Sequence, residues 1–303
     1  MREPQTRTKY TYDSVGNRLT ALGGSTWSYN TSNELTARPS VTYGYDYNGN
    51  ATTRTDSTGV TTYAWDFENR LTSVTLPGSG GTVSFKYDPF GRRIYKSSSL
   101  GTSIYAYDGN NLIEEANAAG TAVARYTQGS NIDEPLVMLR SSTASYYQAD
   151  GLGSITSLSN AAGTLAETYA FDSFGNRTAS SGSLTNPFQY AGRDLDSETS
   201  LYYMRARYLD PSTGRFMSED PLRFEGGEPD FYVYAAGNPA NLRDPSGLAE
   251  CVYSISQHTM VCTENAVPPV GPPWQLQLGP SVRALTKERR NAKTILPVPI
   301  RKT

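Results

Sequence analysis

A short unit built around two aromatic residues and an aspartate returns along the first 180 residues of the chain. One copy reads YTYDSVGNRLT at residues 10–20, and another reads YAWDFENRLTSV from residue 63. The copies place their aspartates at Asp13, Asp46, Asp66, Asp88, Asp108, Asp150 and Asp172. From Asp46 onwards the steps are 20, 22, 20, 42 and 22 residues, and a degenerate copy at Arg125 divides the longest step. A period of this length indicates an array of similar supersecondary units.

Each position of the unit suits a β-hairpin. Two rings separated by one residue lie on the same face of a strand, because strand side chains alternate. The aspartate begins a turn and accepts hydrogen bonds from backbone amides ahead of it. Glycine three residues later, as at Gly16, supplies a positive φ, and the following leucine, as at Leu19, begins the return strand on the buried face. We expect an all-β antiparallel meander whose tyrosines pack in its core. The alternative is that rows of exposed tyrosines bind carbohydrate by stacking.

Composition agrees with this fold class and restricts the chemistry. The chain has 22 tyrosines and 27 glycines, which favour strands and turns respectively. Two cysteines and one histidine exclude a zinc site built on four Cys and His ligands, so we expect no metal and no cofactor. The net charge of −2 gives no nucleic-acid signature. Residues 283–303 contain seven Lys or Arg and one acid, so nucleic-acid binding is expected only through this basic end.

Membrane and export signals are missing from the sequence. No apolar run reaches the roughly 18 residues of a transmembrane helix, and MREPQTRTKY lacks the apolar region of a signal peptide. We expect either export by another route or a reading frame that is the tail of a longer protein.

The repeats are followed by segments with a specific resemblance. Residues 133–138 read DEPLVM, residues 146–154 read YYQADGLGS, and residues 201–248 run from LYYMRARY to DPSGL. Together with the repeats, they resemble the YD repeats and associated core of the bacterial Rhs (rearrangement hotspot) family. That family is similar to the C components of insecticidal toxin complexes and to animal teneurins. The resemblance covers about residues 8–248.

The resemblance implies a β-sheet strip coiled into a hollow shell that encloses a C-terminal toxin. With about ten hairpins, this chain is expected to form a partial shell, an arc or an open bowl. The implied domains are YD repeats at 1–180, an Rhs-associated core at 181–248 that ends in DPSGL, and a small, irregular, variable tail at 249–303.

The same resemblance implies aspartyl self-cleavage after the leucine of the DPxGL motif. The matching positions are Arg207, Asp220 and Asp244, and the cleaved bond joins Leu248 to Ala249. Two neighbouring carboxylates can share a proton, so that one activates water while the other protonates the carbonyl oxygen or the leaving amine. The chain would then be at most a single-turnover autoprotease. Many family members have glycine where this chain has Arg223, and that departure near Asp220 puts the catalytic geometry in question; Asp210 is assigned to a turn.

The tail contains one symmetric segment. Residues 251–262 form a palindrome-like pattern centred on residues 256–257, so a hairpin would place Cys251 opposite Cys262. A disulfide between them is expected in an oxidising compartment, and two buried free thiols are the alternative.

We expect a secreted or cell-surface bacterial protein: the carrier or encapsulating part of a polymorphic toxin that releases its tail by self-cleavage. Its expected partners are its own C-terminal tail peptide, an immunity protein and secretion-system components. The competing interpretation is a non-catalytic exported or cell-surface repeat protein that binds carbohydrate or protein, or a truncated remnant of one.

Overall fold

The computed structural model describes residues 10–21, 25–248, 251–254 and 259–262. All of these belong to the first of two compact units, Met1–Pro268. The second unit, Pro269–Thr303, lies outside the described residues, and so does the basic end of the chain.

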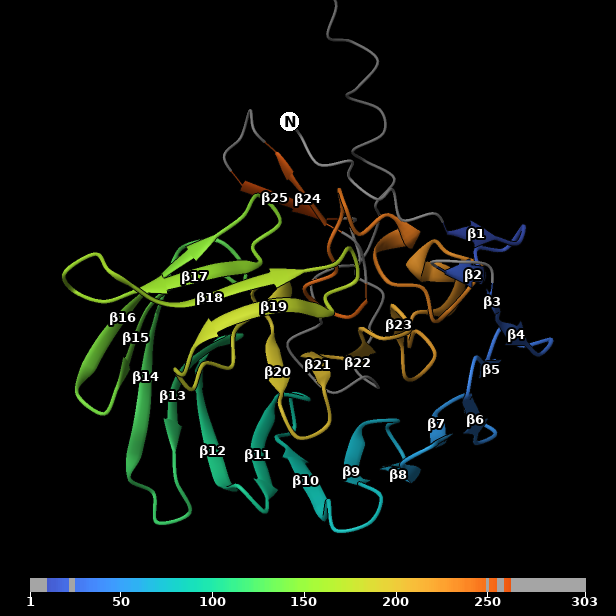
Figure 1. Cartoon of the computed structure of the whole chain (residues 1–303), viewed down its shortest axis with the longest axis horizontal. Helices are drawn as coiled ribbons and strands as arrows, with labels where there is room; N and C mark the ends of the chain where they lie inside the picture. The colour runs from blue at the N-terminus through green and yellow to red at the C-terminus, as the bar shows by residue number, and fades with distance from the viewer. Residues whose placement is uncertain (1–9, 22–24, 249–250, 255–258, 263–303) are drawn as a thin grey trace, which may run out of the picture. The chain divides into compact units, whose positions relative to one another are not determined.

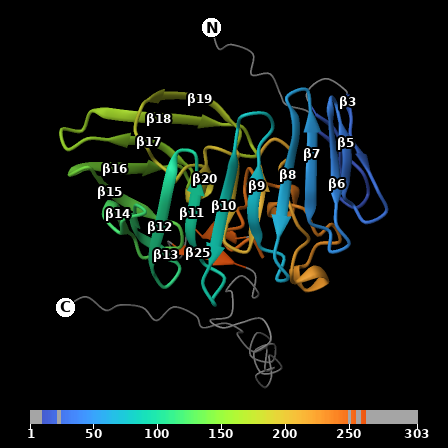
Figure 2. The same cartoon turned by 90° about the horizontal axis from the view of Figure 1, so that it is seen from below.

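One antiparallel sheet of sixteen strands dominates this unit, and neighbours in the sheet are neighbours in the chain. The strands are β4 (Ser28–Tyr29), β5 (Leu35–Arg38), β6 (Val41–Tyr45), β7 (Ala51–Asp56), β8 (Gly59–Trp65), β9 (Leu71–Thr75), β10 (Thr82–Tyr87), β11 (Arg93–Ser98), β12 (Gly101–Asp108), β13 (Asn111–Ala116), β14 (Ala122–Gln128), β15 (Pro135–Arg140), β16 (Thr143–Ala149), β17 (Ile155–Ser159), β18 (Leu165–Phe171) and β19 (Arg177–Gly182). Seen from below, many of them stand side by side in chain order (Figure 2). The predicted hairpin meander is confirmed.

The other regular elements among the described residues are three smaller sheets and three 3-10 helices. The first sheet contains β1 (Thr11–Tyr12), β2 (Arg18–Ala21) and β3 (Ser25–Thr26). The second contains β20 (Asp194–Asp196), β21 (Leu201–Met204), β22 (Arg207–Asp210) and β23 (Arg215–Phe216). The third is the hairpin of β24 (Cys251–Ser254) and β25 (Thr259–Cys262). The 3-10 helices are η1 (Tyr190–Gly192), η2 (Arg223–Gly226) and η3 (Ala235–Gly237).

The repeat aspartates organise the hairpin turns as their position predicts. At Asp46, Oδ1 accepts the amides of Asn48 and Asn50, both at 2.9 Å. Gly49 follows with a φ of 76°. The same pair of bonds, from the amides two and four residues ahead, forms at Asp13, Asp66, Asp88, Asp150 and Asp172. Each carboxylate therefore accepts hydrogen bonds from two turn amides that have no partner in the neighbouring strands and would otherwise bind water.

Asp108 departs from this pattern. It is the last residue of β12 and pairs directly with Asn111 across a two-residue turn, where Gly109 has a φ of 57°. In this shorter turn Leu112, four residues after the aspartate, is already in the return strand, where it pairs with Tyr107. The loop that the other aspartates cap is therefore not formed. The expected capping role of Asp108 is therefore wrong, although the hairpin itself forms.

The buried position of the return strand lies five residues after the aspartate. Ala51, Leu71 and Ile155 fill it with apolar side chains. In the first unit this position is Arg18, which is 7% exposed, while Leu19 is only half-buried. The expectation that Leu19 takes the buried face is wrong, because it lies one residue further along an alternating strand.

The inner face of the sheet packs on the chain that follows it. We call residues 183–248 the core segment. Figure 1 shows its strands β20–β23 on the inner side of the curve that runs from β4 to β19. Tyr63 and Phe85 of the sheet share a buried cluster with Tyr203 and Tyr208 of the core segment. Further repeat tyrosines pack against this cluster or a second one: Tyr45, Tyr87, Tyr105, Tyr107 and Tyr147. The packing interpretation is confirmed for these tyrosines, and carbohydrate binding stays an untested alternative.

Buried polar contacts fix the core segment in register with the hairpins. Arg93 donates to Asp196, which is 103 residues away, and the two charges are 2.5 Å apart. The amide of Ala51 donates to Met217 O at 2.8 Å. A buried charge that loses its partner strongly destabilises the folded protein. The core segment is therefore favoured in the one docked position in which these pairs form.

The long sheet is open, as expected for a partial shell. Among the described strands, β4 and β19 each pair with a single neighbour. The ends of the array nevertheless meet through side chains. Phe174, in the last repeat turn, lies 5.5 Å from the ring of Tyr10, and the guanidinium of Arg18 stacks over it at 4.0 Å.

Candidate functional site

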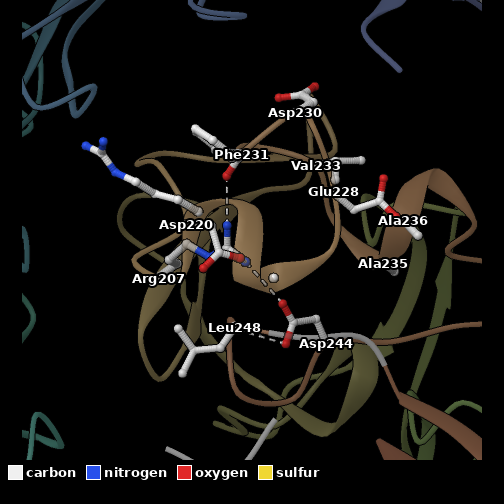
Figure 3. Close-up of a pocket in the computed structure, with 12 residues that line it drawn as sticks. Arg207, Asp220, Glu228, Asp230, Phe231, Val233, Ala235, Ala236, Asp244 and Leu248 are labelled. Atoms are coloured by element: carbon white, nitrogen blue, oxygen red, sulfur yellow. Dashed lines mark hydrogen bonds and ion pairs between the residues drawn. The ribbon is translucent and has the colours of Figure 1, made fainter. Parts of the chain in front are cut away.

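The three residues expected to catalyse self-cleavage come together in the core segment. Nη2 of Arg207 lies 2.9 Å from Oδ2 of Asp220 and 3.3 Å from Oδ2 of Asp244. Arg207 comes from the start of β22, and the aspartates follow 13 and 37 residues later. One guanidinium therefore bridges both carboxylates, as Figure 3 shows.

Arg207 is held rigidly. It is 3% exposed and its guanidinium stacks over the ring of Phe216 at 3.6 Å. It also donates to the carbonyl of Phe231 at 2.9 Å and to the carbonyl of Gly247. Burial lowers the pKa of Arg207 below that of a free arginine, against the opposite influence of the two aspartates. Arginine begins from so high a pKa that the group stays charged, which makes it a fixed cation.

Asp220 is fixed by its own turn. Its Oδ1 accepts the amide of Leu222 at 2.8 Å, and its amide donates to Phe231 O at 2.9 Å. The first carboxylate oxygen thus orders the start of a turn, while the second, Oδ2, contacts Arg207. A carboxylate bound at both oxygens has little freedom to rotate away from the site.

Asp244 anchors the segment that is expected to be cut. Its Oδ1 accepts the amide of Gly247 at 2.8 Å and that of Leu248 at 3.1 Å. The hydroxyl of Ser246 donates to the same oxygen at 3.2 Å. The DPSGL motif therefore folds around its own aspartate, which fixes the orientation of the peptide group that precedes Leu248.

Gly247 is required by its surroundings. Its φ is 71°, and a Cβ there would lie 2.4 Å from the carbonyl oxygen of Met204. Ala206 also donates its amide to Ser246 O at 3.1 Å. The motif thus packs directly on the β21–β22 turn, and only glycine allows so close an approach.

A small cavity opens beside the two aspartates. Its volume is about 20 Å³, enough for one water molecule. Arg207, Asp220, Asp244 and Leu248 all contribute to its wall, together with Arg223, Gly226, Glu228, Asp230, Phe231, Val233, Ala235 and Ala236. Two of these, Ala235 and Ala236, have φ values of 51° and 50°, a conformation that is uncommon for residues other than glycine.

Arg223 does not displace Asp220. Its φ is 49°, the left-handed conformation that glycine adopts without strain. The backbone at position 223 therefore takes the conformation that a glycine would allow, and Asp220 remains 2.9 Å from Arg207. The doubt raised by this departure from the family pattern is not supported by the geometry.

The DPSGL motif is also tied to the long sheet. Arg205 donates to both carboxylate oxygens of Asp133, in the β14–β15 turn, and to the carbonyl of Pro245. Arg193 donates to Asp133 as well, at 2.7 Å. Burial alone raises the pKa of Asp133, but Arg193 and Arg205 outweigh it and hold that pKa below the ordinary value. The sequence gives no signal for this pairing, because its members lie 60 and 72 residues apart.

Two further expectations concern single residues. Asp210 accepts the amide of Ser212 at 2.8 Å in the β22–β23 turn, so its assignment to a turn is confirmed. Ala249, on the far side of the expected cut, lies outside the described residues.

The tail begins with the predicted hairpin. Cys251 and Cys262 stand opposite each other at the ends of β24 and β25. The backbone N–H and C=O of Cys251 are hydrogen-bonded to Arg243 and not to Cys262. In the β24–β25 ladder the two cysteines are therefore a pair without backbone hydrogen bonds between them. In such pairs the Cα atoms are about 4.5 Å apart, which lies within the range that a disulfide spans. The disulfide stays a prediction that this register favours.

The parts of the chain that the structure describes contain no group of three or more His, Cys, Asp or Glu side chains placed to hold a metal ion. Within the same residues, no helix has the length and apolar character needed to cross a membrane.

Known proteins share this architecture. The family model for the teneurin YD-shell matches residues 2–231. The tRNA nuclease WapA of Bacillus subtilis is 35% identical over 261 residues, which are 81% of this chain and 11% of that protein. The toxin protein Tse5 of Pseudomonas aeruginosa is 45% identical over 62 residues, 20% of this chain and 5% of the toxin. This chain thus spans a small part of the length of these two relatives.

A solved structure supports the same fold. The crystal structure of TcdB2-TccC3 superposes with a TM-score of 0.51 at 18% identity, over 80% of this chain and 17% of that one. With the match of the family model to most of the chain, the chain belongs to the teneurin YD-shell family and thus to the Rhs/YD-repeat proteins.

Proposed function

We propose that this chain is the end of a toxin-carrying β-shell and that it cuts its own backbone after Leu248. The observation that carries the proposal is the guanidinium of Arg207, which binds Asp220 and Asp244 at the wall of a water-sized cavity that Leu248 also lines. Such an arrangement brings a base, a fixed cation and a peptide group together beside a space for one water, among buried charged side chains.

The proposed reaction is hydrolysis of one amide bond. A water molecule in the cavity attacks the carbonyl carbon of Leu248 while Asp220 accepts one of its protons. Asp220 then returns that proton to the nitrogen of Ala249 as the Leu248–Ala249 bond breaks. The products are a new carboxyl group on Leu248 and a new amino terminus at Ala249.

Asp244 and Arg207 have supporting parts in this reaction. Oδ1 of Asp244 already accepts three donors, including the amide of Leu248, so we assign it the task of holding the substrate peptide. Arg207 keeps both carboxylates in place and supplies positive charge. Since enzyme and substrate are one chain, the reaction occurs once per molecule.

The test is the intact mass of the full-length purified chain, with Asp220→Asn and Asp244→Asn compared with wild type. We expect the wild type to yield a fragment that begins at Ala249, and each variant to lose cleavage at least about 100-fold. Asparagine keeps a carbonyl acceptor for the turn amides, so the fold is retained. Asp210→Asn, at a turn away from the site, is the matched control and should cleave normally. A wild type that remains uncut would refute the proposal.

The carrier role rests on the relatives. WapA and Tse5 are named as a nuclease and a toxin, and this chain matches only a small part of each. We infer that the chain is the shell portion of a secreted toxin and that the tail after Leu248 is its cargo. An immunity protein and a secretion machinery are the partners that this role requires. Co-purification of the cut tail with the shell after cleavage, and its loss on denaturation, would test encapsulation.

A further inference from the structure

We propose that Gly226 is a positioning residue whose missing side chain keeps open the space in which the attacking water is held against Asp220. The inference rests on the proposed self-cleavage and adds a residue to it. Gly226 ends η2, within the segment from Glu225 to Glu228 that separates the two aspartates.

The space in question touches both reacting groups. A Cβ on Gly226 would lie 3.0 Å from Oδ2 of Asp220 and 3.7 Å from the carbonyl oxygen of Leu248. Gly226 also lines the cavity beside Asp220 and Asp244. A water oxygen at the same place is within hydrogen-bond distance of the carboxylate and faces the carbonyl group to be cut. A methyl group and the water compete for this position.

The backbone does not explain the glycine. Gly227 has a φ of 94°, a conformation that favours glycine, whereas Gly226 is not among the residues with positive φ. An L-residue at position 226 therefore meets no conformational penalty of that kind. What a side chain meets there is Asp220.

Asp220 cannot move aside at low cost. Its Oδ1 is bound to the amide of Leu222 at 2.8 Å, and its Oδ2 lies 2.9 Å from the buried guanidinium of Arg207. A shift large enough to accept a methyl group lengthens at least one of these contacts. Either outcome, a displaced water or a displaced carboxylate, slows the reaction while the turn remains in place.

The experiment measures how fast the full-length chain is cut after its synthesis in a cell-free translation reaction. The unfolding temperature is measured separately, for each variant combined with Asp244→Asn so that the chain stays uncut. We expect Gly226→Ala to slow cleavage at least about tenfold with little change in unfolding temperature. Gly226→Val, with a larger side chain, should slow it further. Gly151→Ala is the matched control, because Gly151 has no positive φ and a Cβ there meets nothing within 4 Å. It should cleave like wild type.

The possible results separate this inference from the function on which it rests. If wild type cleaves and Gly226→Ala cleaves equally fast, the role of Gly226 is refuted and self-cleavage stands. If wild type does not cleave, the proposed function fails, and the role of Gly226 fails with it.

A second measurement decides the case in which Gly226→Ala lowers both the rate and the unfolding temperature. Crystal structures of the uncleaved Asp244→Asn chain, with and without Gly226→Ala, are compared at the cavity. We expect an ordered water on the carboxylate of Asp220 only when glycine is present. A water that persists beside alanine overturns the proposal.

Discussion

Arg223 holds a backbone conformation that suits glycine better than arginine. Its φ is 49°, and its side chain makes one ion pair, with Glu219 at 3.4 Å, while 68% of that side chain remains exposed. The left-handed conformation costs a non-glycine residue roughly 1–2 kcal/mol, which glycine would avoid. The greater conformational freedom of glycine in the unfolded chain cancels part of that stabilisation. We expect Arg223→Gly to raise the free energy of unfolding by about 0.5–1 kcal/mol. Urea denaturation measures this change, and a decrease would contradict it.

Gly247 should tolerate no side chain. Its positive φ and the 2.4 Å approach of a Cβ to Met204 O act together. We expect Gly247→Ala to lower the free energy of unfolding by more than about 1 kcal/mol and to stop cleavage, because the peptide before Leu248 moves. Thermal unfolding and intact mass report the two effects. A stable, normally cut variant would show that the contact is not essential.

Asp133 links the long sheet to the site through a pH-dependent contact. Its pKa is lowered in the folded chain, so its contribution to stability is present above the unfolded pKa, about 4, and is lost as pH falls through the lower folded value. Asp133→Asn removes the carboxylate that pairs with Arg205 and leaves Arg193 only the more distant Asp194, at 3.6 Å, which should cost about 3 kcal/mol at pH 7. Unfolding measured from pH 7 to pH 3 should show a smaller acid loss in the variant than in wild type. Equal acid losses would count against this assignment.

At the scale of single residues, the sequence predicted the site through its resemblance to the family. Arg207, Asp220 and Asp244 were identified in that way and do lie together. Asp133 stands in the DEPLVM segment, but that segment assigns it no role, and Gly226 belongs to no motif used in the prediction. The partners of Asp133, Arg193 and Arg205, lie 60 and 72 residues away in the chain, and only tertiary packing brings them into contact.

At the scale of elements, the β24–β25 hairpin offers a redox test. Cys251 is 1% exposed and lies opposite Cys262 in a non-hydrogen-bonded pair. We expect the purified, air-oxidised chain to resist alkylation when it is denatured without reductant, and to take up two alkyl groups after reduction. Mass spectrometry under the two conditions distinguishes a disulfide from two free thiols. Uptake without reductant would favour the thiols.

The hairpins were the most predictable elements, and the docking of the core segment the least. A unit such as YGYDYNGNATT, residues 43–53, contains its own turn chemistry, since the aspartate, the glycine and the alternating strand residues act within a few positions. The contact between Arg93 and Asp196 spans 103 residues and has no local signature. Arg18 and Leu19 also show where prediction from the sequence fails. An error of one residue in the expected strand register exchanges the buried and exposed faces, and here it exchanged these two residues.

At the scale of the whole described unit, Arg18 joins the two ends of the hairpin array. Its guanidinium lies 4.7 Å from the ring centroid of Tyr10, 4.8 Å from that of Trp27 and 4.0 Å from that of Phe174. Buried cation–π contacts contribute about 2 kcal/mol, and leucine cannot replace them. Arg18→Leu should therefore speed amide hydrogen exchange in β1, β2 and the turn at Phe174, and leave the central strands unchanged.

The control for that experiment is Arg125→Leu, since the side chain of Arg125 is 64% exposed in the middle of the array. It should leave exchange near Arg18 unaltered. If Arg18→Leu speeds exchange throughout the unit, Arg18 stabilises the whole fold and does not specifically hold the two ends of the array together.

The strict order of the sixteen strands has a consequence for the time course of folding. Each hairpin contacts the one made just before it, so the sheet can grow during synthesis with little loop-closure entropy at any step. The residues that bind the core segment are thus in place before Arg207 leaves the ribosome, and Asp244 arrives last of the three. Self-cleavage would then mark the completion of folding, and a chain that stalls with its interior unfilled would keep its tail attached.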